Sequence, residues 1–244
     1  MRILSLILIT SFSLANNLTG YDIIKSLNDK EKPDNVKSTL IMKSIKKGKT
    51  RTSKFISWSK NSGELQLMWF LEPRQYKGMS FLNIKNNMTM WLPSYKKIRK
   101  VSSQNKQKSF MNSDLSYEDF DIRNINMYTY EKSDQNQLYD SVECYVVTSV
   151  PKDVKETIYL KYEIWISKDK LNPVKEISFD KTGKAIKEKV FSYRTKEGLD
   201  IIESLIVKNL EKGTHTELYI DDIKLNTDLT KDYFKEINLK RIPK

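Results

Sequence analysis

Apolar and polar side chains alternate with a period of two over most of this chain, which is the pattern of β-strands. The clearest example is residues 65–71, where leucine or tryptophan fills every second position. Turns are predicted at six glycines, spaced fifteen residues apart within each set of three: Gly48, Gly63, Gly78, Gly183, Gly198 and Gly213. Strands of this length joined by short turns predict one long antiparallel meander, which must curl because strands twist.

Helical periodicity is confined to a few short stretches. Residues 18–30 are predicted to form an amphipathic helix, with Thr19 as its N-cap and Pro33 just beyond its end. Short helical turns are expected in 114–120 and 229–234. Several strands carry apolar side chains on both faces, and so few helices cannot cover a sheet of about ten strands. We therefore predict a mainly β fold, a curved antiparallel half-barrel with an apolar hollow.

The N-terminus has the composition of a secretory signal peptide. Arg2 precedes an apolar run at 3–12, and residues 13–15 form a small-x-small cleavage site. The run is too short to span a bilayer of ~30 Å. No cysteine stands near the cleavage site, so we expect export to the periplasm without a lipid anchor. Cleavage after residue 15 would leave residues 16–244 as a single domain, long enough for a full core.

The composition argues against most kinds of site chemistry. The chain has one cysteine, Cys144, and one histidine, His215, which lie far apart, so a cluster of metal ligands is not expected. The sequence has no G-x-S-x-G motif and no glycine-rich phosphate loop. We therefore expect neither an enzyme nor a metal or other cofactor. The formal charge of +12 is spread along the chain without a nucleic-acid-binding motif, which favours contact with anionic membrane surfaces over nucleic acid.

One stretch, residues 88–120, combines four kinds of sequence in order. An apolar strand that ends at Pro93 is followed by a basic segment, by two large apolar residues in loop-like sequence, and by closely spaced carboxylates. An apolar wall, a basic rim, an apolar plug and an acidic rim suit the mouth of a site for an amphiphile. A strand, a solvated basic turn and a loop packed on the core would explain the same residues. The sequence alone leaves both interpretations open.

The same stretch reads W-L-P at 91–93, Y-K-K-I-R-K at 95–100 and S-F-M-N-S-D-L-S-Y-E-D at 109–119. These residues resemble the signature block of periplasmic LolA-like outer-membrane lipoprotein-sorting proteins. The branch in question has the pattern W-x-Y-L-P followed by S-F-M-G-S-D-F-S-Y-E-D. The likeness continues from Pro73 to the ending at 234–239, so it spans nearly the whole mature chain.

The resemblance implies a LolA-like half-barrel with short lid helices over an apolar cavity that holds acyl chains of lipoproteins or related lipids. The candidate cavity residues are Met42, Leu67, Trp69, Met79, Phe81, Met88, Met90, Trp91, Phe110, Met111, Leu160, Tyr162 and Ile164. Lys96, Lys97 and Arg99 would meet a phosphate or carboxyl headgroup at the rim. Asn112 stands where the branch has glycine, and asparagine tolerates the left-handed backbone that glycine adopts.

By this resemblance we expect a monomeric carrier that ferries acyl chains toward the outer membrane. Its partners would be an inner-membrane exporter, an outer-membrane acceptor and, transiently, the membrane itself. Burying an acyl chain yields ~0.8 kcal/mol per CH₂, so such a site needs little polar specificity. Two other functions stay open: an accessory or sensor protein of an exporter or signalling complex, and a lipid hydrolase that uses His215.

Overall fold

The structure of this protein is a computed structural model that describes residues 18–155 and 157–243. Within them, one α-helix, α1 (Gly20–Asp29), precedes fourteen strands. The strands are β1 (Asn35–Lys46), β2 (Lys49–Lys60), β3 (Leu65–Glu72), β4 (Ser80–Ile84), β5 (Asn87–Leu92), β6 (Lys97–Lys100), β7 (Tyr128–Lys132), β8 (Gln137–Tyr139), β9 (Val142–Pro151), β10 (Lys161–Ser167), β11 (Pro173–Phe179), β12 (Ala185–Lys196), β13 (Leu199–Asn209) and β14 (Thr214–Leu225). The predicted signal peptide lies outside the described residues.

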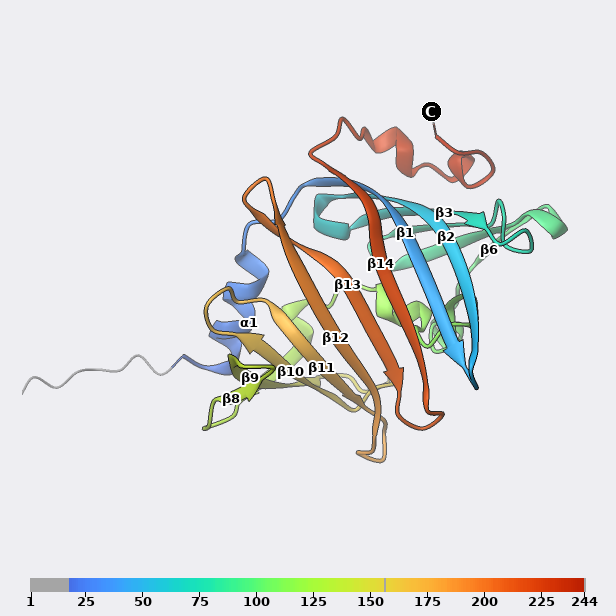
Figure 1. Cartoon of the computed structure of the whole chain (residues 1–244). Helices are drawn as coiled ribbons and strands as arrows, with labels where there is room; N and C mark the ends of the chain where they lie inside the picture. The colour runs from blue at the N-terminus through green and yellow to red at the C-terminus, as the bar shows by residue number, and fades with distance from the viewer. Residues whose placement is uncertain (1–17, 156, 244) are drawn as a thin grey trace, which may run out of the picture.

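All fourteen strands belong to one antiparallel sheet, in the order β6-β5-β4-β3-β2-β1-β14-β13-β12-β11-β10-β9-β7. β8 extends the same edge as β7, because both pair with β9. Strands β1 to β6 pair in chain order, as do β9 to β14, and β1 pairs with β14, so these two meanders join at the middle of the sheet (Figure 1). β6 and β7 lie at opposite edges of the described sheet and do not pair with each other, so the sheet is not closed into a barrel. The curved, antiparallel half-barrel predicted from the alternation is confirmed, with more strands than expected.

The hairpins show why the glycine spacing predicted turns. In the β1–β2 turn Lys47 and Gly48 have φ values of 50° and 73°, and in the β12–β13 turn Glu197 and Gly198 have 52° and 78°. Two successive residues with positive φ make the two-residue turn that matches the twist of antiparallel strands. Glycine adopts this conformation without steric cost, so it fixes the second position of each turn.

Two elements lie on the concave face of the sheet. The first is α1, whose capping box joins the Thr19 hydroxyl and backbone to Asp22. Its buried residues Ile23 and Ile24 pack with side chains of β9 and β10, including Val147 and Ile164. The predicted helix at 18–30 is thus confirmed, slightly shortened at both ends.

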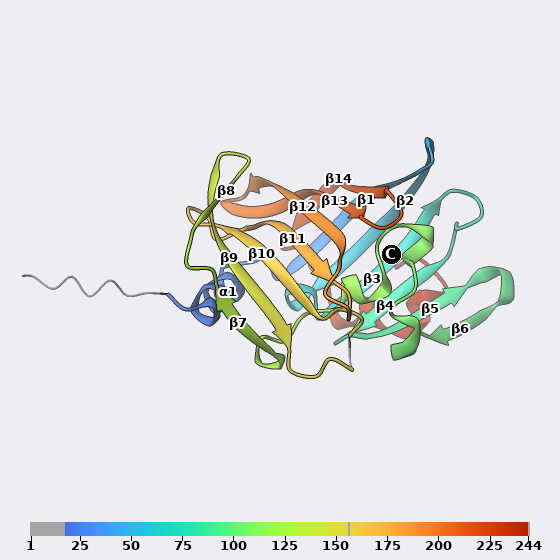
Figure 2. The ribbon, with the colours of Figure 1, turned by 90° about the horizontal axis from the view of Figure 1, so that it is seen from below.

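The second concave-face element is residues 102–127, between β6 and β7, which we call the cover segment. It contains four 3₁₀ turns: η3 (Ser103–Asn105), η4 (Phe110–Asn112), η5 (Tyr117–Phe120) and η6 (Ile125–Met127). Figure 2 shows α1 beside β7, β9 and β10, and the green cover segment beside β3, β4 and β5. The short lid helices implied by the resemblance are these 3₁₀ turns, of which η5 falls in the predicted stretch 114–120.

The convex face carries the C-terminal segment, residues 226–243. Its 3₁₀ turns, η7 (Lys231–Phe234) and η8 (Glu236–Leu239), place Phe234 and Leu239 over β2, β3 and β4. The Ser80 hydroxyl donates to the Leu239 carbonyl at 2.6 Å, which fixes the end of the segment to β4. The predicted helical turn at 229–234 therefore exists as η7. Of the described helices, none is long and apolar enough to cross a membrane.

Candidate functional site

The candidate cavity residues do not share one surface. Those in the concave cluster beneath the cover segment are Met42, Met79, Phe81, Met88, Met90, Phe110 and Met111. Those in the concave cluster beneath α1 are Tyr162 and Ile164. Those on the convex face, beneath the C-terminal segment, are Leu67, Trp69 and Trp91. Leu160 is half-buried just before β10. Neighbouring side chains of a strand point to opposite faces, so the large residues supply separate cores.

The cover segment fills the place where the hollow was expected. Phe110 is fully buried, and its ring centroid lies 5.0 Å from that of Phe81 and 4.5 Å from that of Phe120. Met111 is buried in the same cluster. Asn112 has a φ of 60°, the left-handed conformation that asparagine tolerates. This part of the predicted cavity is thus occupied by the protein's own side chains.

Buried carboxylates fasten the cover segment to the sheet. The Asp119 side chain is 2% exposed, and its oxygens lie 2.6 Å from Lys187 Nζ and 2.7 Å from Lys189 Nζ, both on β12. Asp114 is buried as well and accepts hydrogen bonds from the hydroxyls of Thr214, at 2.5 Å, and Thr216, at 2.8 Å. For these two carboxylates the structure agrees with the interpretation of a loop packed on the core and not with an acidic rim, because the cover segment turns them inward against the sheet.

A second ion pair lies farther along the cover segment. Arg123 donates to both carboxylate oxygens of Glu176 on β11, at 2.5 and 2.8 Å. Its guanidinium also lies 3.7 Å from the ring centroid of Tyr162, a stacked cation–π contact. Glu176 and Asp119 share Lys189, whose Nζ lies 3.1 Å from Glu176. The two ion pairs therefore form one buried network between the cover segment and two strands.

The charges of this network shift one another's pKa values. Burial by itself would raise the pKa of Asp119, but the charges of Lys189 and Lys187 hold it below its ordinary value. Burial would also raise the pKa of Glu176, but Arg123 and Lys189 lower it to about 2. Burial would lower the pKa of Lys189, but Asp119 and Glu176 raise it. Asp119, Glu176 and Lys189 are therefore charged at neutral pH.

An apolar cavity of about 530 Å³ opens between the end of α1, the start of β1 and the adjoining parts of β13 and β14. Its apolar lining includes Leu27, Val36, Ile201, Ile220 and Ile223. Lys30 stands at the α1 side, where its ammonium binds Asp200 at 3.0 Å and Asn172 at 2.6 Å. The volume lies within the range of small-molecule sites, roughly 300–1,000 Å³. The protein thus has an apolar hollow, although at other residues than the sequence indicated.

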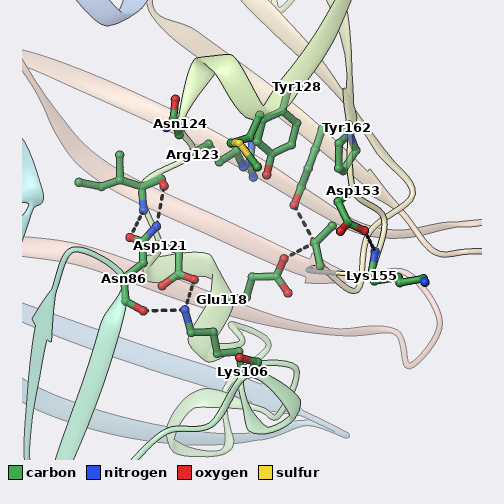
Figure 3. Close-up of a pocket in the computed structure, with 15 residues that line it drawn as sticks. Asn86, Lys106, Glu118, Asp121, Arg123, Asn124, Tyr128, Asp153, Lys155 and Tyr162 are labelled. Carbon is green, nitrogen blue, oxygen red and sulfur yellow. Dashed lines mark hydrogen bonds and ion pairs between the residues drawn. The ribbon is translucent and has the colours of Figure 1, made fainter.

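A polar cavity of about 440 Å³ lies at the other side of the cover segment (Figure 3). The rings of Tyr128 and Tyr162 form one wall, and Lys106, Glu118 and Asp121 form the opposite wall. Lys106 Nζ binds Asp121 Oδ2 at 2.6 Å, and Glu118 accepts a hydrogen bond from Thr157. Tyr162 is the candidate cavity residue that borders this space.

The predicted headgroup rim lies apart from both cavities. Lys96, Lys97 and Arg99 are exposed at the β5–β6 hairpin, and none of the three lines either cavity. Lys106 and Arg123, which the sequence analysis did not select, are the basic residues of the cover segment that border the polar cavity. The headgroup role of the rim residues stays a prediction.

His215 lies on the opposite side of β14 from Thr216, which contacts the cover segment. Its side chain is 39% exposed, and Nε2 lies 3.6 Å from Glu217 Oε1. Among the described residues, no group of three or more histidine, cysteine or carboxylate side chains could hold a metal ion. Cys144 is a buried free cysteine between β-strand neighbours, as expected of a small apolar residue.

The sequence analysis missed the residues that carry most of the site. Lys187 and Lys189 flank Glu188 on β12, and three consecutive charged residues are typical of solvent-exposed sequence. The cover segment, which is distant in sequence, packs over this face of β12 and buries both lysines. Ile201, Ile220 and Ile223 are apolar residues of predicted strands, and their sequence does not distinguish a cavity wall from a packed core.

Comparisons with known proteins agree with this architecture. A family model described as "Uncharacterized protein"-like matches residues 62–241. The chain belongs to that family. A solved structure of a putative outer membrane lipoprotein-sorting protein domain from Vibrio parahaemolyticus has a TM-score of 0.86 at 24% identity, over 91% of this chain and 98% of its own. A search of curated proteins finds no match.

Two further solved structures share the fold. A DUF1329 family protein from Desulfovibrio piger has a TM-score of 0.85 at 26% identity, over 90% of this chain and 97% of its own. A LolA superfamily protein from Nitrosomonas europaea has a TM-score of 0.74 at 18% identity, over 90% of this chain and 99% of its own. This protein therefore has the LolA-superfamily fold, as the resemblance in its sequence implied. None of these three descriptions names an enzyme.

Proposed function

We propose that this protein binds the acyl chain of a lipoprotein or lipid in the apolar cavity and carries it through the periplasm toward the outer membrane. The observation that carries the proposal is the apolar cavity itself, a hollow lined by leucine, valine and isoleucine on the concave face of a LolA-superfamily sheet. Each buried CH₂ contributes ~0.8 kcal/mol, so a long chain binds without polar recognition.

The direction of transport and the cellular location rest on support of a different kind. The neighbour from Vibrio parahaemolyticus is described as a lipoprotein-sorting domain. The N-terminal sequence has the form of a signal peptide, which fits one exported domain of residues 16–244. The basic β5–β6 hairpin would contact anionic membrane surfaces during loading or delivery. In this proposal the protein is a carrier and no enzyme, and its donor and acceptor at the two membranes are proteins or lipids of the envelope.

The test is a binding experiment on delipidated protein with a fluorescent fatty acid, paired with native mass spectrometry of protein purified from its own envelope. We expect saturable fatty-acid binding and a co-purified lipid. Absence of fatty-acid binding by folded protein would reject the proposal. A stoichiometric protein partner in place of lipid would favour the accessory or sensor function. Lipase activity that disappears in His215→Ala would favour the hydrolase.

A further inference from the structure

Exposed basic side chains gather where the β5–β6 hairpin meets the C-terminal segment. Residues 93–101 and 237–243 contain no acidic residue and six basic ones: Lys96, Lys97, Arg99, Lys100, Lys240 and Arg241. All six are exposed, and none has an ion-pair partner among the described residues. We call the exposed surface of these two ranges the basic patch. The neighbouring Glu236 supplies one carboxylate, so the patch keeps a strong positive charge.

Packing joins the two halves of the basic patch. Trp91 and Ile98, which are paired across β5 and β6, belong to the same apolar cluster as Phe234 and Leu239 of the C-terminal segment. Lys240 Nζ lies 5.6 Å from the centroid of a Trp91 ring, a cation–π contact. Figure 1 shows the red C-terminal segment beside this hairpin. The positive charges therefore belong to one surface, although the two ranges are far apart in the sequence.

Large apolar side chains stand among these charges. Tyr95 ends the 3₁₀ turn η2 (Pro93–Tyr95) at the tip of the hairpin and is 68% exposed. Ile237 is 51% exposed, and Ile242, which follows Arg241, is 42% exposed. Tyrosine is enriched at membrane–water interfaces, and basic side chains are attracted to anionic headgroups. The basic patch therefore combines the two kinds of side chain that a peripheral membrane contact uses.

The shape of this region favours a membrane over an acidic protein. The β5–β6 hairpin projects from the body of the sheet, so its tip can enter a layer of headgroups (Figure 2). A protein interface has a core depleted of charged residues. In the basic patch, Tyr95 is followed directly by Lys96, and Ile242 directly follows Arg241, so charges and apolar side chains are mixed.

We propose that the basic patch docks on an anionic lipid bilayer, with Tyr95 and Ile237 among the headgroups and the basic side chains against lipid phosphates. The proposed function gives this contact to the hairpin alone. Here the C-terminal segment supplies a second half of the docking surface. The inference rests on the proposed function in placing the protein beside the envelope membranes, and it is independent of acyl-chain binding.

The test is co-sedimentation with vesicles of phosphatidylcholine, prepared with and without phosphatidylglycerol. We expect wild-type protein to bind the vesicles that contain phosphatidylglycerol, and salt to weaken this binding. Lys240→Gln combined with Arg241→Gln should weaken it at least tenfold, since each basic residue near an anionic surface contributes about fivefold. The matched control, Lys47→Gln with Lys49→Gln, removes two exposed charges at the β1–β2 turn and should bind nearly as wild type.

A fluorescent label reports insertion directly. Ile237→Cys carries an environment-sensitive dye, and Lys47→Cys carries the same dye as a control; the native Cys144 is buried and should not react. We expect the emission to shift to the blue at position 237 when phosphatidylglycerol vesicles are added, and to stay unchanged at position 47. Equal shifts at both positions, or no shift at either, would overturn the inference.

The outcomes separate this inference from the proposed function. Undiminished vesicle binding by the Lys240→Gln, Arg241→Gln variant overturns the inference and leaves the contact through the hairpin standing. Wild-type protein that binds neither kind of vesicle, or both equally, also overturns it. Fatty-acid binding is measured on the same preparations, and its absence rejects the acyl-chain carrier whatever the vesicles show.

Discussion

Arg123 and Glu176 form a two-pronged ion pair, with Nη1–Oε2 and Nη2–Oε1 distances of 2.5 and 2.8 Å. The pair joins the cover segment to β11, and the Glu176 side chain is 7% exposed. A buried pair of this kind adds little net stability over an apolar pair, but removing one partner leaves the other charge uncompensated. The ion pair therefore fixes the cover segment against β11, and replacing either partner alone destabilises the fold.

We expect Glu176→Gln to lower the free energy of unfolding by about 3–5 kcal/mol, because Arg123 and Lys189 lose their shared counter-charge. Urea unfolding followed by tryptophan fluorescence measures the change. The control is Glu211→Gln, which breaks a 3.0 Å pair with Lys184 at an exposed site and should change stability by less than about 0.5 kcal/mol. Equal effects of the two variants would contradict the importance of the buried network.

Stability should fall in acid because the folded-state pKa of Glu176 is lowered from 4.5 to about 2. A depressed carboxyl pKa contributes stability above the unfolded value, and this is lost as pH falls toward the folded value. Between pH 4.5 and 2 we expect each such group to add a slope of at most about 1.4 kcal/mol per pH unit. Asp119, whose pKa is also lowered, acts in the same direction. Urea unfolding at several pH values should show a smaller slope in Glu176→Gln, and an unchanged slope would show that this carboxyl does not carry the effect.

Filling the apolar cavity should abolish fatty-acid binding. Ile202 lines this cavity on β13 and is 40% exposed, so Ile202→Trp adds bulk there with little cost to the core. We expect at least a tenfold weaker affinity in a fluorescence titration. Ile84→Trp introduces the same side chain at a 38% exposed isoleucine of β4 that lies outside the cavity, and it should bind as wild type. An equal loss of fatty-acid affinity in both variants would indicate a general effect of the added tryptophan and not a filled cavity.

The convex-face residues should affect stability and leave ligand binding alone. Phe234 is 4% exposed and packs in the cluster that contains Trp91. We expect Phe234→Ala to destabilise the protein by about 3–5 kcal/mol through the cavity that it leaves. Fatty-acid affinity, measured under conditions where the variant is folded, should not change. Weakened binding in folded Phe234→Ala would restore Trp91 and its neighbours as candidate ligand contacts.

The rim residues should act at the membrane surface and have no effect in the cavities. Replacing Lys96, Lys97 and Arg99 by glutamine removes three exposed positive charges from the β5–β6 hairpin. Each such charge contributes about 1 kcal/mol near an anionic surface. We expect weaker co-sedimentation with vesicles that contain phosphatidylglycerol and unchanged fatty-acid binding. Loss of fatty-acid binding would instead support the headgroup role first predicted for these residues.

Much of the fold follows from local sequence patterns. Alternation along β3 assigned Leu67 and Trp69 to one face and Met68 and Phe70 to the other, and the structure has them so. Glycines such as Gly48 located the hairpin turns, because a left-handed backbone is a local requirement. These features need only a few neighbouring residues, so a single sequence is enough to predict them.

The faces that became cavity or core were decided by tertiary structure. Leu67 and Trp69 are apolar and share a strand face, but the C-terminal segment covers that face and makes it a core. Asp119 and Lys189 are ordinary polar residues in sequence, and only the docking of the cover segment on β12 buries them together. By itself the sequence determined the open antiparallel sheet, its turns and its helix, because period, capping and turn residues act locally. The position of the hollow depended on how segments far apart in the chain pack against the sheet. A strand face is buried only when another segment covers it, and its own sequence does not specify that segment.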